Sequence, residues 1–112
     1  MSTLLDEYRG VASDHGKHTQ QGDHKKANVA HDRLGEILKS FVAAEEDQQL
    51  FSLYEDSDQW VQAWAAAHTL EIDEARAIAK LEELQMAEIP LVSMGAKYTI
   101  QEWKSGDLKF RE

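Results

Sequence analysis

A length of 112 residues allows one hydrophobic core but not two ordinary domains, so we expect a single domain over residues 1–112 with a short tail from about residue 107. Hydrophobic residues make up 42% of the chain, and 21 acidic against 12 basic side chains give a formal charge of -9, which argues against disorder, nucleic-acid binding and anionic membrane surfaces. The absence of cysteine excludes disulfides and a cysteine nucleophile, and no segment resembles a signal peptide or the roughly 20 apolar residues of a membrane span, so we expect a cytoplasmic protein.

The first two predicted helices are separated by the sequence QGDHKK. Thr3 is a suitable N-cap for the first helix. Its apolar residues recur at helical spacing and are Leu4, Leu5, Tyr8, Val11 and Ala12. Gly22 is expected to end this helix and Asp23 to cap the second. The second helix presents one apolar face to a core, made of Ala27, Ala30, Leu34, Ile37, Leu38 and Phe41.

A shorter third helix is predicted over EEDQQLFSLYE, with Glu45, Glu46 and Asp47 in its first turn, where the helix dipole favours acidic residues. Its inward residues are expected to be Leu50, Phe51, Leu53 and Tyr54. The next stretch, DQWVQAWAAAHTL, follows Ser57 or Asp58 as its cap and is apolar around most of its circumference. A helix with so narrow a polar stripe is buried on several sides, which predicts the central helix of the fold.

Asp73 is expected to cap a fifth helix, EARAIAKLEELQM, whose predicted inward residues are Ala75, Ile78, Ala79, Leu81 and Leu84. Pro90 is predicted in the first turn of a sixth helix, which Gly106 ends. The apolar residues of this last helix are Leu91, Met94, Ala96, Ile100 and Trp103. The short turns favour antiparallel neighbours, so we expect an all-α fold of about six helices in three antiparallel hairpins, a short HEAT-like α-solenoid or right-handed superhelix.

The stretch LFSLYEDSDQWVQAWAAAHTL resembles a HEAT-type repeat, in which two leucines end one helix, an acidic turn follows, and valine, paired alanines and leucine line the next helix. These positions are Leu50, Leu53, Asp56, Asp58, Val61, Ala65, Ala66 and Leu70. With GDHKKANVAHDRL before it and AKYTIQEWKSGDL after it, the chain over residues 4–108 resembles the small bacterial family called domain of unknown function 2019. The most specific matches are Gly22, Asp23, Asn28, Val61, Trp64, Ala65, Ala66, Ala96, Trp103 and Gly106. The resemblance implies the helical fold and carries no established activity.

Trp60 opens the central helix, where burial is often incomplete. The aromatic residue Tyr54 and the acidic residues Asp56 and Asp58 shortly precede it in the sequence. We expect a partner-binding surface made of Trp60, Tyr54, Asp56 and Asp58, the alternative being that Trp60 covers an edge of the core. This predicts a non-enzymatic protein-interaction module whose protein partner is basic. Antitoxin-type or immunity-type neutralisation of a basic toxin is one concrete version.

The histidines support a second hypothesis, a metal-binding or small-ligand-binding protein or enzyme. His24, Asn28 and His31 fall on one helical face at i, i+4 and i+7, and His18 or His15 near the end of the first helix would complete the site. The alternative is that these side chains are solvated around a polar turn. Because the chain has no H-E-x-x-H or E-x-x-H pattern, we expect no cofactor and no catalytic residue.

His68 lies on the crowded central helix. A single histidine in an alanine-rich core is usually hydrogen-bonded to a neighbour, so a structural role is expected rather than general-base catalysis. A third hypothesis is a homo-oligomer, because three helical hairpins leave two solenoid ends with apolar faces that need covering.

Overall fold

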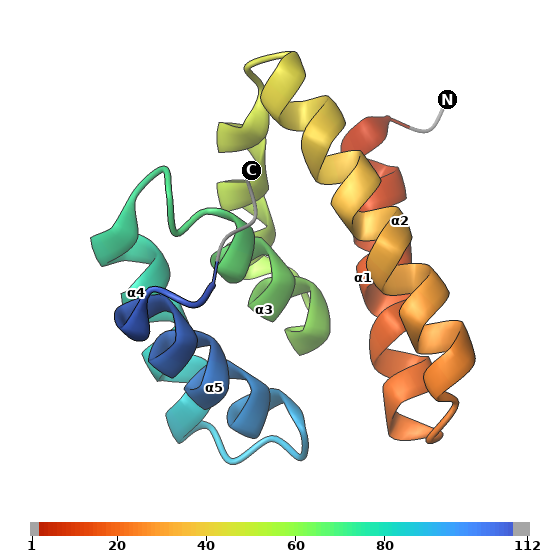
Figure 1. The fold of residues 1–112 in the computed structure, drawn as a ribbon, viewed down its shortest axis with the longest axis vertical. Coiled ribbons are helices and arrows are strands. Elements are labelled where there is room, and N and C mark those ends of the chain that lie inside the picture. The colour runs from red at the N-terminus through yellow and green to blue at the C-terminus, as the bar shows by residue number, and fades with distance from the viewer. Residues whose placement is uncertain (1–2, 109–112) are drawn as a thin grey trace.

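The computed structural model describes residues 3–108, and within that range the fold is all-α, as the sequence predicts (Figure 1). The described part contains six helices and no strand. In chain order they are α1 (Leu4–Gln20), α2 (His24–Ala43), the 3-10 helix η1 (Asp47–Glu55), α3 (Gln59–His68), α4 (Glu74–Met86) and α5 (Val92–Ser105). No helix in residues 3–108 is both long enough and apolar enough to cross a bilayer.

Helices that follow one another in the chain pack against each other: α1 against α2, η1 against α3, and α4 against α5. Helix α3 also contacts α1, α4 and α5, and it lies between the α1–α2 pair and the α4–α5 pair (Figure 1). The central position predicted for this helix is therefore confirmed. Its almost complete apolar circumference is explained by neighbours on several sides.

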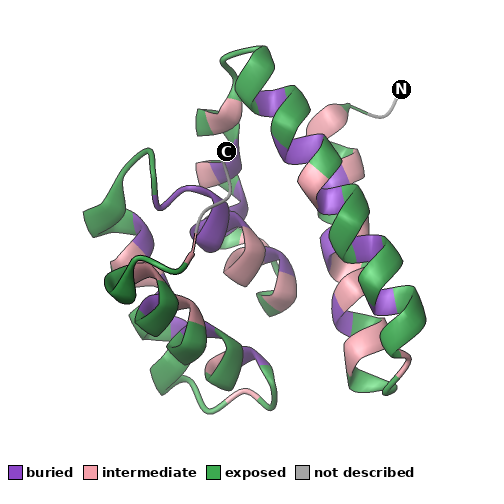
Figure 2. Cartoon of the chain, in the orientation of Figure 1, coloured by how far each residue is buried: buried purple, intermediate pink, exposed green. Residues whose placement is uncertain are grey.

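The core is formed where these helices face one another, and the exposed residues lie on their outer surfaces (Figure 2). The apolar face predicted for α2 is buried in full. Hydrophobic residues that are at most 1% exposed come from five of the six helices and from the turn after α3: Tyr8, Ala12, Leu34, Ile37, Phe41, Leu50, Val61, Ala65, Ala66, Leu70, Ala77 and Leu81. A single core thus joins the first helix pair to the last.

All the N-caps predicted for the α-helices are confirmed. The Thr3 hydroxyl accepts a hydrogen bond from the backbone N–H of Asp6, and the Asp6 carboxylate accepts one from the N–H of Thr3. Asp23 and Asp73 cap α2 and α4 in the same way through their carboxylates. Of the two candidates before α3, Asp58 is the cap.

Both glycines predicted to end helices are also confirmed. Gly22 (φ +74) follows α1, and Gly106 (φ +83) follows α5, so each adopts the left-handed conformation that closes a helix. After Gly22, the N–H of Asp23 donates to the carbonyl oxygen of His18 at 2.9 Å. This bond satisfies one of the free carbonyl groups at the end of α1.

The segment between α2 and α3 differs from the prediction. Glu45 does not open the third helix; it has φ +57 and ends α2, where its N–H donates to the Val42 carbonyl oxygen. The helix that follows starts at Asp47 and is a 3-10 helix rather than an α-helix. Its inward residues Leu50 and Leu53 are buried as predicted, while Phe51 is half-buried. The chain reverses direction at Glu45 because α2 ends there with a left-handed residue.

Helices α4 and α5 show two further differences. In α4, Ala77 is buried, whereas the predicted inward residues Ala75 and Ala79 are exposed, because the buried stripe runs through Ala77, Leu81 and Leu84 at i, i+4 and i+7. Pro90 lies before α5 rather than in its first turn, since α5 starts at Val92. Of the apolar residues assigned to this helix, Leu91 precedes it, and both Leu91 and Met94 are exposed.

Candidate interaction groove

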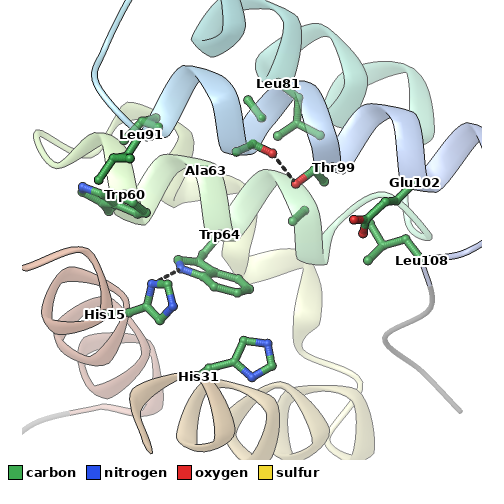
Figure 3. A pocket seen from close by; sticks show the side chains of 14 residues that line it. His15, His31, Trp60, Ala63, Trp64, Leu81, Leu91, Thr99, Glu102 and Leu108 are labelled. Carbon is green, nitrogen blue, oxygen red and sulfur yellow. Dashed lines mark hydrogen bonds between the residues drawn. The ribbon is translucent and has the colours of Figure 1, made fainter. Parts of the chain in front are cut away.

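A groove of about 310 Å³ runs along α3 (Figure 3). Residues of α1 and α2 form one of its walls, and residues of α5 form the other. Most of its lining is apolar or aromatic. It is formed by His15, His31, Trp60, Ala63, Trp64, Ala67, Leu81, Leu91, Val92, Gly95, Ala96, Thr99, Glu102 and Leu108, and we call it the aromatic groove. A concave, mostly apolar surface with a few polar groups is the usual form of a binding site.

The hollow shape follows from the size of the residues on two facing helices. Helix α3 contributes Ala63, which lies between its two tryptophans in the sequence, and Ala67, which follows the second one. Helix α5 contributes Gly95 and Ala96. Because these side chains are short, they cannot fill the space between α3 and α5 that the larger side chains at the edges hold open.

Trp64 connects the groove to both N-terminal helices. Its indole Nε1 donates to His15 Nδ1 at 3.3 Å (Figure 3), and the two rings meet edge-to-face with centroids 5.1 Å apart. The His31 ring lies 5.6 Å from the Trp64 ring and 6.4 Å from the His15 ring. The structure therefore brings together one aromatic residue from each of α1, α2 and α3.

The contact with Trp64 also bears on the charge of His15. Burial lowers the pKa of His15 below its ordinary value of 6.5, and the neighbouring His31 and His18 lower it further. A neutral imidazole can accept the Trp64 hydrogen bond at Nδ1, whereas a protonated one cannot. His15 thus presents a neutral ring to the groove at pH 7.

The two ends of the groove differ in chemistry. Leu91 lies near Trp60 at one end, and Glu102 lies beside Leu108 at the other (Figure 3). The Glu102 carboxylate is exposed and forms no hydrogen bond or ion pair with another described side chain. Between the ends, the Thr99 hydroxyl donates to the Gly95 carbonyl oxygen at 2.9 Å. One end is therefore apolar and the other carries a free negative charge.

Leu91 is held in an unfavourable backbone conformation. It has φ +67 and ψ -39, and the N–H of Val92 donates to the Pro90 carbonyl oxygen at 2.8 Å across it. This is a three-residue turn of the rare type that is strained for a branched side chain. Its side chain is 40% exposed. Strain at an exposed apolar residue beside a groove is typical of functional surfaces.

Of the four residues predicted for partner binding, only Trp60 lines the aromatic groove. Tyr54 is 7% exposed, and its hydroxyl lies 2.5 Å from the Thr69 hydroxyl, so most of its side chain belongs to the core, and it lines a different, shallow pocket with Arg76. The Asp56 carboxylate accepts a hydrogen bond from Arg9. The carboxylate of Asp58 accepts hydrogen bonds from the Ser13 hydroxyl and the Trp60 N–H. Both acids thus fasten the turn before α3 to α1 and position Trp60.

The histidine-rich face predicted for a metal or ligand is divided by the structure. His24 and Asn28 are exposed. His18 lines a separate shallow pocket between α1 and α2, whereas His31 and its alternative partner His15 both line the aromatic groove. Within residues 3–108, no three His, Cys, Asp or Glu side chains lie together in a way that could hold a metal ion. His31 therefore meets His15, one of the two residues predicted to complete the site, and the centroids of their rings are 6.4 Å apart.

His68 is a hydrogen-bonded core residue, as predicted. Its Nδ1 lies 2.6 Å from the Tyr8 hydroxyl, and both side chains are buried. Burial, together with the nearby Tyr54, raises the pKa of Tyr8 well above its ordinary value. The tyrosine therefore keeps its proton, and this pair ties α1 to the end of α3.

No family model and no curated protein matches the sequence. The structure is similar to the crystal structure of the protein RPA1889 from Rhodopseudomonas palustris CGA009, with a TM-score of 0.86 over 95% of this chain and 89% of that chain. The two sequences are 19% identical. At this identity the likeness shows a shared fold and nothing about activity.

Proposed function

We propose that the protein is a non-enzymatic interaction module, built as a short HEAT-like α-solenoid, that receives an apolar segment of a cytoplasmic partner protein in the aromatic groove. The packing of consecutive helices in pairs supports the solenoid. The observation that carries the binding function is the groove itself, where Trp60, Trp64 and a strained, exposed Leu91 surround an unfilled hollow. Tryptophan is among the residues most enriched at interaction hot spots.

The chemistry of the groove favours binding over catalysis. His15 is its most buried titratable group, and its Nδ1 is already occupied by the Trp64 N–H. A general base needs a free nitrogen aimed at a substrate proton. The formal charge of -9 additionally favours a basic partner, and neutralisation of a basic toxin is the concrete version that we propose to test.

A site-specific photo-crosslinking experiment tests this function. A benzophenone amino acid is placed at Thr99, which lines the groove, and separately at Gln48, which is exposed on η1 away from it. After irradiation in a lysate of the source organism, the Thr99 protein should form one specific adduct that is weaker at high salt. The Gln48 protein should not form it.

A second variant links the adduct to the groove surface. Leu91→Ser removes an exposed apolar side chain, so the fold should persist while the adduct decreases. An adduct that forms equally from Gln48, or that is unaffected by Leu91→Ser, would refute the groove as the interaction surface.

A further inference from the structure

The aromatic groove has a direction. Leu91, which directly precedes α5, and Glu102, which lies within α5, are at opposite ends of the groove and 11 residues apart, which corresponds to about 16 Å at the helical rise. Trp60 lies near the Leu91 end, and the Trp64 ring extends towards the Glu102 end (Figure 3). An occupant that fills the groove must therefore be apolar at one end and suited to a carboxylate at the other.

We infer that the occupant is a basic amphipathic helix, which places apolar side chains against Trp60 and Leu91 and an arginine or lysine side chain across Trp64 towards Glu102. This inference rests on the proposed function and adds the chemistry of the partner. It differs from the proposal of a general apolar segment in requiring both a helical conformation and a cation at one defined end.

The helical conformation follows from the polar groups that the groove lacks. An extended peptide exposes backbone N–H and C=O groups that need partners when they are buried. The groove offers few, because its lining is mainly apolar and its Thr99 hydroxyl already donates to Gly95. A helix satisfies its own backbone, and the short side chains of Ala63, Ala67 and Gly95 let it approach closely.

The requirement for a cationic side chain in the occupant follows from the charges of the residues that line the groove. Among the described residues that line the groove, none is a lysine or arginine, and Glu102 carries the one carboxylate. A guanidinium or ammonium group here would meet that carboxylate and the indole of Trp64, which attracts cations through its π-electrons. His15 and His31 form the facing wall, and the neutral form of His15 does not repel a cation.

The probes are synthetic helical peptides of about 15 residues. They carry leucine, phenylalanine or tryptophan at i and i+4 and arginine at i+7 or i+11. Each has a twin in which citrulline, a neutral isostere, replaces the arginine. Binding is measured by tryptophan fluorescence and calorimetry, and peptide helicity in the complex by NMR.

The protein variants are Glu102→Gln, which removes the charge at the groove end, and Glu82→Gln, which removes an exposed carboxylate of α4 outside the groove. We expect arginine peptides to bind wild-type protein roughly 3- to 10-fold more tightly than their citrulline twins. The ratio should approach one in Glu102→Gln and stay at the wild-type value in Glu82→Gln.

The outcomes separate this inference from the proposed function. Equal binding of the twins, or a ratio that is unchanged in Glu102→Gln, overturns the cation while leaving an apolar groove function in place. A bound peptide that is extended overturns the helix. If no peptide of the panel binds, the inference fails, and the adduct at Thr99 alone decides the proposed function. If peptides bind and Leu91→Ser weakens none of them, both the inference and the proposed function fail.

Discussion

Gly16 on α1 lies directly against the indole ring of Trp60: a methyl group on the Gly16 Cα would be 2.3 Å from Trp60 Cγ and 2.5 Å from its Cδ1. No real side chain tolerates such a contact, so the ring or the helix would have to move. Gly16 is buried inside α1, where glycine is otherwise unfavourable. Its role is to let Trp60 sit against α1 at the mouth of the groove.

The first prediction concerns this contact. Gly16→Ala should lower the free energy of unfolding by about 1–3 kcal/mol, because overpacking against Trp60 outweighs the better helix propensity of alanine. Gly10→Ala is the matched control, since Gly10 lies in the same helix and an added methyl group there meets nothing within 4 Å. Gly10→Ala should raise the free energy of unfolding by up to about 1 kcal/mol. Urea unfolding measures both.

These two variants also differ in fluorescence. Gly16→Ala should change the emission of the folded protein by displacing Trp60, whereas Gly10→Ala should not. If the two alanine variants are equally stable and have the same emission, the close approach of Gly16 to Trp60 does not exist.

The second prediction concerns the turn before α3. The Asp58 carboxylate accepts the Trp60 N–H at 2.8 Å and the Ser13 hydroxyl at 2.7 Å. Asp58→Ala should therefore cost about 1–2 kcal/mol of unfolding free energy, through loss of the cap and of the link to α1. Ser57→Ala should change it by less than about 0.5 kcal/mol, because Ser57 is exposed and does not cap the helix. Both variants are measured by thermal or urea unfolding. If they lose equal amounts of unfolding free energy, the assignment of Asp58 as the cap is contradicted.

The third prediction concerns the end of α2. Glu45 has φ +57, a conformation that is strained in residues with a Cβ atom. Glu45→Gly should raise the free energy of unfolding by about 0.5–1 kcal/mol. Glu45→Ala removes the same charge but keeps the Cβ atom and therefore the strain, so its free energy of unfolding should stay near that of the wild type. A stabilisation of equal size in both variants would show that charge, not backbone conformation, is responsible.

The fourth prediction concerns pH. The pKa of His15 is lowered in the folded protein by burial, and then by His31 on α2 and His18 on α1, while the unfolded chain has the ordinary value of 6.5. Between these two pKa values the unfolded chain binds more protons, so stability increases with pH and is lost as the pH falls from about 7 through 6.5 towards the folded pKa. Protonation at Nδ1 would also break the hydrogen bond from Trp64.

His15→Gln should flatten this part of the stability profile, measured as the urea midpoint at a series of pH values. His24→Gln is the control, because His24 is an exposed histidine outside the groove. The NMR signal of the Trp64 indole N–H should shift over the same pH range in the wild type. A profile that is as steep in His15→Gln as in the control would rule out His15 as the responsible group.

Local features of the structure could be predicted because their causes are local. Thr3, Asp23, Asp58 and Asp73 cap helices through backbone groups two or three residues away, so residue type and spacing were sufficient to identify them. The buried face of α2 follows in the same way from helical periodicity. The three described non-glycine residues with positive φ, which are Glu45, Glu88 and Leu91, were not predicted, since neither residue type favours that conformation.

The sequence by itself thus determined an all-α chain, the buried character of its central helix and a charge that disfavours nucleic acid. Only the tertiary structure decided which side chains meet. It placed Tyr54 in the core, made Asp56 and Asp58 supports for Trp60, and combined His15, His31 and Trp64 from three helices. Periodicity defines a face on each helix, but the angle and depth at which helices pack depend on contacts far apart in the chain, such as that between Gly16 and Trp60.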